Sequence, residues 1–151
     1  MIIELNENID IKEILTSGAC FRIKEEPDGS ITNILKDRVI NIQQQNNILK
    51  ITASNYENLE EIIYEYFDLN RNYKKINEEI IKNNKELKSI VKKCEKYRII
   101  NQDSFEMCIS YIISQNNNVK RISKSIEELS TKYGSKITFN TVSTLGGSKH
   151  E

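Results

Sequence analysis

The sequence of 151 residues has no tryptophan, one proline, three cysteines and one histidine. A zinc site takes about four clustered cysteine or histidine ligands. The cysteines Cys20, Cys94 and Cys108 are far apart and include no C-x-x-C pair, and His150 lies next to the last residue. This set excludes a zinc site and a Ser-His-Asp triad. We therefore expect no metal, no cofactor, and reduced cysteines with a structural role.

Long apolar runs are also absent. No segment approaches the roughly 20 apolar residues that a membrane-spanning helix needs, and the N-terminus lacks the basic region of a secretory signal. The sequence thus predicts no contact with a membrane and a cytoplasmic location, as in a bacterial cytoplasm or nucleoid. With 38% hydrophobic residues, the chain is long enough for one domain or two small lobes with a buried core.

The net charge of zero conceals an uneven distribution. Residues 1–70 carry 6 Lys and Arg against 13 Asp and Glu, whereas residues 71–151 carry 16 against 9. The basic half can face a polyanion while the acidic half faces away. One basic run consists of Lys82, Lys85, Lys88, Lys92, Lys93, Lys96 and Arg98. Its first four lysines, at spacings of 3, 3 and 4, form one helical stripe. That stripe can contact phosphates, but a solvated helix face is the commoner outcome.

The first third of the chain has the pattern of a sheet. Residues 20–24 alternate apolar and polar side chains, Pro27-Asp28-Gly29 is a strong turn signal, and three further extended runs cover 31–36, 38–43 and 48–53. These features predict an antiparallel meander. A short helix over 11–15, capped by Asp10, precedes it.

The remainder has helical periodicity. Helices are expected over 56–67 with Asn55 as the cap, over 73–84, over 85–96, from the cap Asp103 to Ile113, and over 118–133 with Gly134 as the end. Strands followed by helices, without alternation, indicate an α+β fold. Residues 135–151 have no periodicity and are expected to form an irregular tail.

Three asparagines, Asn116, Asn117 and Asn118, stand between two predicted helices, and Arg121 follows one turn later. Short amides and exposed N–H groups at a helix start can bind a polar ligand or a phosphate, and the guanidinium can bond a base edge. The alternative is a simple helix cap in a sequence with 18 asparagines.

A second candidate is the turn before the first predicted strand of the meander. Gly18 allows close approach of the backbone to a ligand, and Phe21 adds an aromatic ring nearby. The alternative is an ordinary helix-to-strand turn. Elsewhere the sequence offers no Gly-rich phosphate loop and no carboxylate pair in an apolar setting, so residue chemistry alone identifies no catalytic group.

These segments occur in an order that resembles a known family. The motifs are S-G-A-C-F-R at 17–22, R-I-I-N-Q-D-S-F-E at 98–106 and S-Q-N-N-N-V-K-R-I at 114–122. Together they resemble the 8-oxoguanine DNA glycosylase family over roughly residues 10–134. The resemblance implies a sheet domain with its closing helix over 1–68, the first helices of a helix-hairpin-helix glycosylase domain over 69–134, and a tail over 135–151.

The resemblance also implies a function, namely base-excision repair by removal of 8-oxoguanine from duplex DNA with associated AP-lyase cleavage. Gly18 and Phe21 match residues that bind the lesion base, the Gly18 carbonyl accepting from its N7–H. Asn116 and Arg121 match residues that fill the gap and face the estranged cytosine. Asn117 and Asn118 match neighbours that support the turn. Ala19 and Ile23 stand where the family often has Gln and Trp.

The family's nucleophilic lysine and assisting aspartate have no match in the sequence, and Lys149 lacks the context of that lysine. The resemblance therefore implies no catalytic residue in this chain, which is compatible with a truncated and inactive form. We expect a monomer whose partner is double-stranded DNA containing oxidised guanine. The alternatives are a non-catalytic module that binds DNA or protein, and an unstable fragment with uncovered apolar faces.

Overall fold

The computed structural model describes residues 1–139. Most of the predicted tail, including Lys149 and His150, lies outside the described residues. Residues 135–139 form neither helix nor strand.

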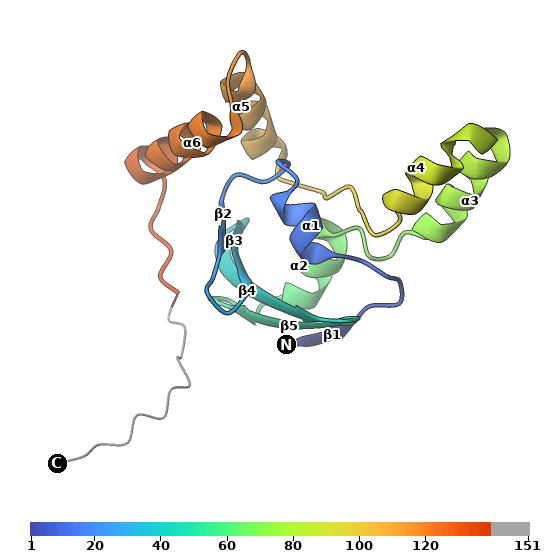
Figure 1. Ribbon diagram of the computed structural model, residues 1–151. Helices are drawn as coiled ribbons and strands as arrows, with labels where there is room; N and C mark the ends of the chain where they lie inside the picture. The colour runs from blue at the N-terminus through green and yellow to red at the C-terminus, as the bar shows by residue number, and fades with distance from the viewer. Residues whose placement is uncertain (140–151) are drawn as a thin grey trace.

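A five-stranded antiparallel sheet forms the first part of the molecule (Figure 1). Its strands are β1 (Ile2–Glu4), β2 (Ile23–Glu25), β3 (Ile31–Leu35), β4 (Arg38–Gln45) and β5 (Ile48–Ala53), in the order β1-β5-β4-β3-β2. The predicted meander is confirmed. Strand β1 was missed because three residues are too few to show a period of two; it pairs with β5 through Ile3 opposite Leu49.

The prediction of a strand over residues 20–24 is wrong in its bounds, because ladder pairing with β3 begins at Ile23. The Cys20 side chain turns into the protein toward Tyr66, and Arg22 pairs with Glu106. These contacts direct the side chains of Cys20 and Arg22 toward other elements, and before Ile23 only the Arg22 carbonyl bonds to β3, accepting from the backbone N–H of Ile34 at 3.4 Å.

The helices follow the predicted order with two differences. They are α1 (Ile11–Thr16), α2 (Leu59–Tyr66), α3 (Tyr73–Asn83), the 3₁₀ turn η1 (Lys85–Leu87), α4 (Lys88–Lys93), α5 (Ser104–Ser114) and α6 (Val119–Tyr133). Helix α2 begins at Leu59 rather than at Tyr56, since the Asn55 side chain accepts from the backbone of Glu57 in a preceding turn. The predicted 85–96 helix is divided and stops early.

The core lies between the sheet and the helices α1 and α2, which sit inside the curve of the sheet (Figure 1). Ile14 and Leu15 of α1, and Ile63 and Phe67 at α2, are fully buried there. Alternate residues of β5 point into the same core. The period-two and helical patterns of the sequence thus converge on one apolar interior.

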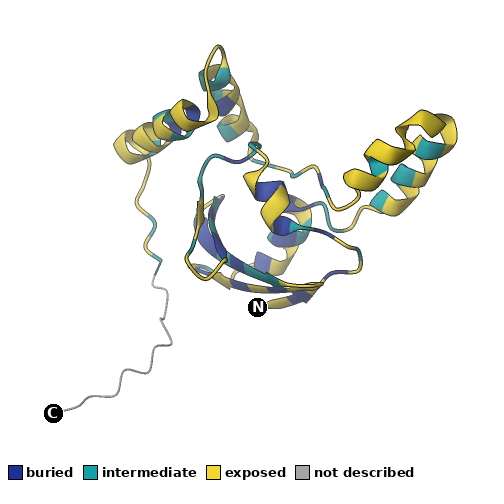
Figure 2. Cartoon of the chain, viewed as in Figure 1, coloured by how far each residue is buried: buried dark blue, intermediate teal, exposed yellow. Residues whose placement is uncertain are grey.

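Two helical hairpins, α3–α4 and α5–α6, project from this core in different directions, and most of their residues are exposed (Figure 2). The segment between α4 and α5 returns to the core before the second hairpin begins. There the backbone N–H of Asn101 donates to the carbonyl of Tyr66 at 2.8 Å. Helix α5 therefore starts from a fixed point on the sheet domain.

Arg98, the last residue of the basic run, lies outside the predicted lysine stripe and is only 2% exposed. Its guanidinium forms an ion pair with Glu7 and donates to the carbonyls of Glu95 and Tyr97. It also stacks on the Tyr73 ring, 4.2 Å from the ring centre. The guanidinium thus supplies the hydrogen-bond donors for two backbone carbonyls that follow α4.

Candidate nucleic-acid interface

The Gly18 turn joins α1 to the segment before β2. Gly18 has a φ of +91°, and a Cβ atom built on it would meet nothing within 4 Å. The position therefore favours glycine because of its left-handed backbone rather than because of crowding. Gly18 and Phe21 are both half-buried, so each keeps part of its surface open to a ligand.

A buried polar group lies beneath this turn. The Cys20 thiol is 3.3 Å from the Tyr66 hydroxyl, to which the Asn33 side-chain amide donates at 3.3 Å. Burial raises the pKa of the Cys20 thiol and that of the Tyr66 hydroxyl, because the charged forms would lose hydration there. Both groups therefore stay neutral near pH 7 and act as hydrogen-bonding anchors.

The asparagine turn connects α5 to α6. The Asn118 side chain accepts from the backbone N–H of Arg121 at 3.1 Å and caps α6. The Asn117 amide donates to the carbonyl of Ile113 at 3.0 Å, and its oxygen accepts from the backbone of Asn118 at 2.9 Å. Two of the three asparagines thus form the turn itself.

Asn116 and Arg121 differ from these two residues. Asn116 has a left-handed φ of 52°, and both residues are exposed. Within residues 1–139 no side-chain hydrogen bond or ion pair engages either of them. An unbonded amide and an unbonded guanidinium at the exposed end of a helical hairpin are free to bind a polar ligand.

A groove of about 960 Å³ lies between the sheet domain and α6. Gly18, Phe21 and Arg22 line one side, and Val119 and Ser123 of α6 line the other. The structure therefore brings the two predicted lesion-binding residues to a groove shared with α6. Asn116, Asn117, Asn118 and Arg121 do not line it; they stand beyond it, around the start of α6.

The sequence alone indicated no role for Gln102, in the segment before α5, or for Glu106 of α5. Both contact the segment that follows Gly18. Gln102 donates to the carbonyl of Ala19 at 2.9 Å, and Glu106 pairs with Arg22 at 3.4 Å. Both belong to the motif at 98–106. Their partners are more than 80 residues away in sequence, so no local pattern could indicate these contacts.

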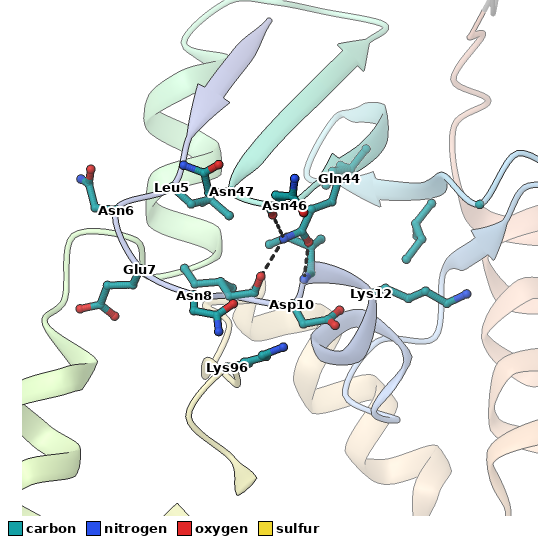
Figure 3. Close-up of a pocket in the computed structure, with 15 residues that line it drawn as sticks. Leu5, Asn6, Glu7, Asn8, Asp10, Lys12, Gln44, Asn46, Asn47 and Lys96 are labelled. Atoms are coloured by element: carbon teal, nitrogen blue, oxygen red, sulfur yellow. Dashed lines mark hydrogen bonds between the residues drawn. The ribbon is translucent and has the colours of Figure 1, made fainter. Parts of the chain in front are cut away.

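A second hollow, of about 730 Å³, lies at the loop before α1 (Figure 3). The Gln44 side-chain amide spans it: its nitrogen donates to the carbonyls of Ile9 and Asn46 at 2.7 and 2.8 Å. Its oxygen accepts from the backbone N–H of Ile11 at 2.9 Å. This amide joins the loop to β4, and the hollow contains none of the predicted site residues.

Residues 1–139 contain no group of three or more His, Cys, Asp or Glu side chains arranged to hold a metal ion. None of the helices in this range is both long enough and apolar enough to cross a bilayer.

The fold and the groove define an α+β protein in which a small antiparallel sheet carries helical hairpins. The family model for the N-terminal domain of 8-oxoguanine DNA glycosylase matches residues 1–108. The chain therefore belongs to the 8-oxoguanine DNA glycosylase family through that domain.

Solved structures agree with this assignment. MBOgg1 in complex with a low-affinity DNA ligand matches with a TM-score of 0.82 at 38% identity, over 91% of this chain and 47% of that one. The 8-oxoguanine glycosylase/lyase of Clostridium acetobutylicum matches in its apo form with a TM-score of 0.82 at 35% identity, over 91% and 48%. Its complex with double-stranded DNA containing cytosine opposite 8-oxoguanine matches with 0.78 at 33%, over 92% and 50%. The chain thus spans about half the length of these proteins.

Proposed function

We propose that this chain recognises 8-oxoguanine in double-stranded DNA as a monomer, in the cytoplasm. Membership of the family supports this proposal, as do the similar solved structures that contain DNA. The observation that carries it is the groove in which the Gly18 turn faces α6, with the exposed Asn116 and Arg121 around the start of that helix.

The Gly18 carbonyl supplies a chemical means of discrimination. Guanine presents N7 as a hydrogen-bond acceptor, whereas 8-oxoguanine carries a hydrogen on N7 and donates there. The Gly18 carbonyl therefore accepts a hydrogen bond from the lesion base. With normal guanine, the carbonyl oxygen and N7 are both acceptors and no hydrogen bond forms, which disfavours binding. Phe21, half-buried on the same side of the groove, contacts the extruded base.

Asn116 and Arg121 act on the other strand in this proposal. Extrusion of the lesion leaves a gap in the duplex and a cytosine without its partner. The Asn116 amide fills the gap, and the Arg121 guanidinium, which has five N–H donors, bonds the acceptors of the estranged cytosine. Asn117 and Asn118 keep the turn in shape through the bonds described above.

Base removal and AP-lyase cleavage are activities of proteins about twice as long. The nucleophilic lysine and assisting aspartate of the family have no match among the 151 residues. We therefore propose that these residues bind the lesion without cutting DNA.

Substitution of Arg121 and Asn116 tests the assignment to DNA. We expect Arg121→Ala to weaken duplex binding about tenfold, since a charge-assisted hydrogen bond to the estranged cytosine is lost. We also expect a lower salt dependence, because one positive charge close to the DNA is removed. Asn116→Ala loses affinity at an unchanged salt dependence, because no charge is removed. Fluorescence polarisation with an 8-oxoguanine·cytosine duplex, between 50 and 200 mM salt, measures both effects.

Lys132→Ala is the matched control, because Lys132 lies at the opposite end of α6 and is exposed. It removes a positive charge from the same helix and is expected to keep the wild-type affinity. Equal affinity in all four proteins would remove Asn116 and Arg121 from the interface.

A second candidate function, a non-catalytic module that binds another protein, is favoured by exposed apolar side chains on α5 and α6. Phe105, Tyr111 and Tyr133 are 75%, 69% and 73% exposed, and large exposed apolar side chains supply contact area for a partner protein. Duplex binding distinguishes the two candidates: a protein-binding module would show no salt-dependent affinity for the duplex.

A further inference from the structure

The segment from Tyr97 to Glu106 is attached to the sheet domain at several points. The Asn101 side chain donates to the carbonyl of Glu65 at 2.8 Å, Gln102 donates to the carbonyl of Ala19, and Glu106 pairs with Arg22. Helix α5, and with it the asparagine turn, starts from this attached segment.

Gln102 has a position that Asn101 does not share. Its amide nitrogen bonds the carbonyl of Ala19, the residue directly after Gly18, at 2.9 Å. Its amide oxygen is 3.9 Å from the Cys20 sulfur, which donates to it. One half-buried side chain thus holds two consecutive residues that follow the glycine.

A glycine in a left-handed conformation has wide backbone freedom, so its carbonyl direction depends on what holds its neighbours. On the Ala19 side that hold comes from Gln102. On the other side, the Ser17 hydroxyl bonds to the carbonyl of Ile14 at 2.8 Å, at the end of α1. The direction of the Gly18 carbonyl is therefore set from both sides.

We infer that Gln102 is a positioning residue that sets the direction of the Gly18 carbonyl toward 8-oxoguanine and thereby determines lesion specificity. This inference rests on the proposed function, because it gives the carbonyl the role of lesion acceptor. Gln102 does not contact the lesion. It acts through the Ala19 peptide and links specificity to the segment that also places α5.

The experiment compares Gln102→Ala with Asn101→Ala, which removes a neighbouring amide that bonds to the same domain but not to the turn. Affinities are measured for an 8-oxoguanine·cytosine duplex and for the same duplex with guanine. We expect Gln102→Ala to lower the preference for the lesion duplex by up to tenfold, the scale of one hydrogen bond, at unchanged affinity for undamaged DNA. Asn101→Ala keeps the preference.

A measurement without DNA tests the hold on the turn directly. Cys94 and Cys108 are exposed whereas Cys20 is buried, so a thiol reagent followed by mass spectrometry distinguishes them. We expect Cys20 to be modified several times faster in Gln102→Ala and at the wild-type rate in Asn101→Ala. Thermal unfolding of both variants confirms that each remains folded.

Each outcome decides between the possibilities. An unchanged lesion preference in Gln102→Ala, or an equal loss in both variants, overturns the positioning role. An unchanged Cys20 rate in Gln102→Ala shows that the amide does not hold the turn. A wild-type protein with no lesion preference overturns the proposed function and, with it, the role of Gln102 in specificity. In that case faster modification of Cys20 in Gln102→Ala would still show that the Gln102 amide fixes the backbone after Gly18.

Discussion

Arg98→Met is expected to destabilise the protein by about 2–4 kcal/mol, because the buried guanidinium leaves polar groups without their donor, although the Glu7 side chain keeps 29% of its surface in contact with solvent. Methionine keeps much of the apolar stem but leaves the Glu7 carboxylate without its partner. It also leaves two backbone carbonyls unbonded and removes the stacking on Tyr73. Thermal unfolding followed by circular dichroism is expected to show a fall in Tm of about 10 °C or more.

Arg71→Met is the matched control. Arg71 pairs with Asp68 at 2.7 Å, but its side chain is 61% exposed, and pairs of this kind contribute about 0–1 kcal/mol. We expect its Tm to stay near that of the wild type. A double variant that also carries Glu7→Gln is expected to lose less than the sum of the single losses, since the unpaired carboxylate is gone. Equal Tm values for Arg98→Met and Arg71→Met would contradict the structural role given to Arg98.

Gly18→Ala is expected to lower the preference for 8-oxoguanine, measured as the ratio of the affinities for the lesion duplex and the undamaged duplex, by about tenfold or more. A site built around one hydrogen bond discriminates poorly once the acceptor points in another direction. An alanine at a φ of +91° is strained, and relief of the strain turns the neighbouring carbonyl. The stability cost is about 1 kcal/mol. The affinities of the lesion duplex and the undamaged duplex, measured side by side, give the preference.

Gly29→Ala provides a control with the same backbone problem in another place. Gly29 has a φ of +81°, and a Cβ atom there also meets nothing within 4 Å, but it lies in the turn between β2 and β3. We expect the same stability cost and an unchanged lesion preference. If both alanine variants keep the preference, the Gly18 carbonyl is not the lesion acceptor.

The elements predicted from the sequence are those whose signals are local. Asp10, Asp103 and Asn118 were expected to start helices, and each side chain accepts a backbone N–H in the first turn. A cap and its partner are two or three residues apart, so a short stretch of sequence contains both. Asn55 was wrong as a cap for α2, because the same side chain can close a turn of its own before the helix.

The features that were missed depend on partners far along the chain. Arg98 ends the basic run of the sequence, yet it is buried and pairs with Glu7, 91 residues away. Gln102 and Ala19 are 83 residues apart. For the candidate site, the motifs indicated Gly18, Phe21 and the asparagine turn, whose roles stay predictions. The groove shared by Gly18 and α6 could not be predicted, because residues 18 and 119 are far apart in the sequence and only the fold places both along one groove.

The fluorescence of 2-aminopurine next to the lesion tests most directly whether this chain extrudes 8-oxoguanine and occupies the gap. This base analogue is dim when stacked in a duplex and bright when its neighbour leaves the stack. We expect saturating protein to raise the fluorescence of the 8-oxoguanine duplex but not of the guanine duplex, and Asn116→Ala to reduce the rise. An unchanged signal at saturation, with binding confirmed by polarisation, would contradict recognition of an extruded base.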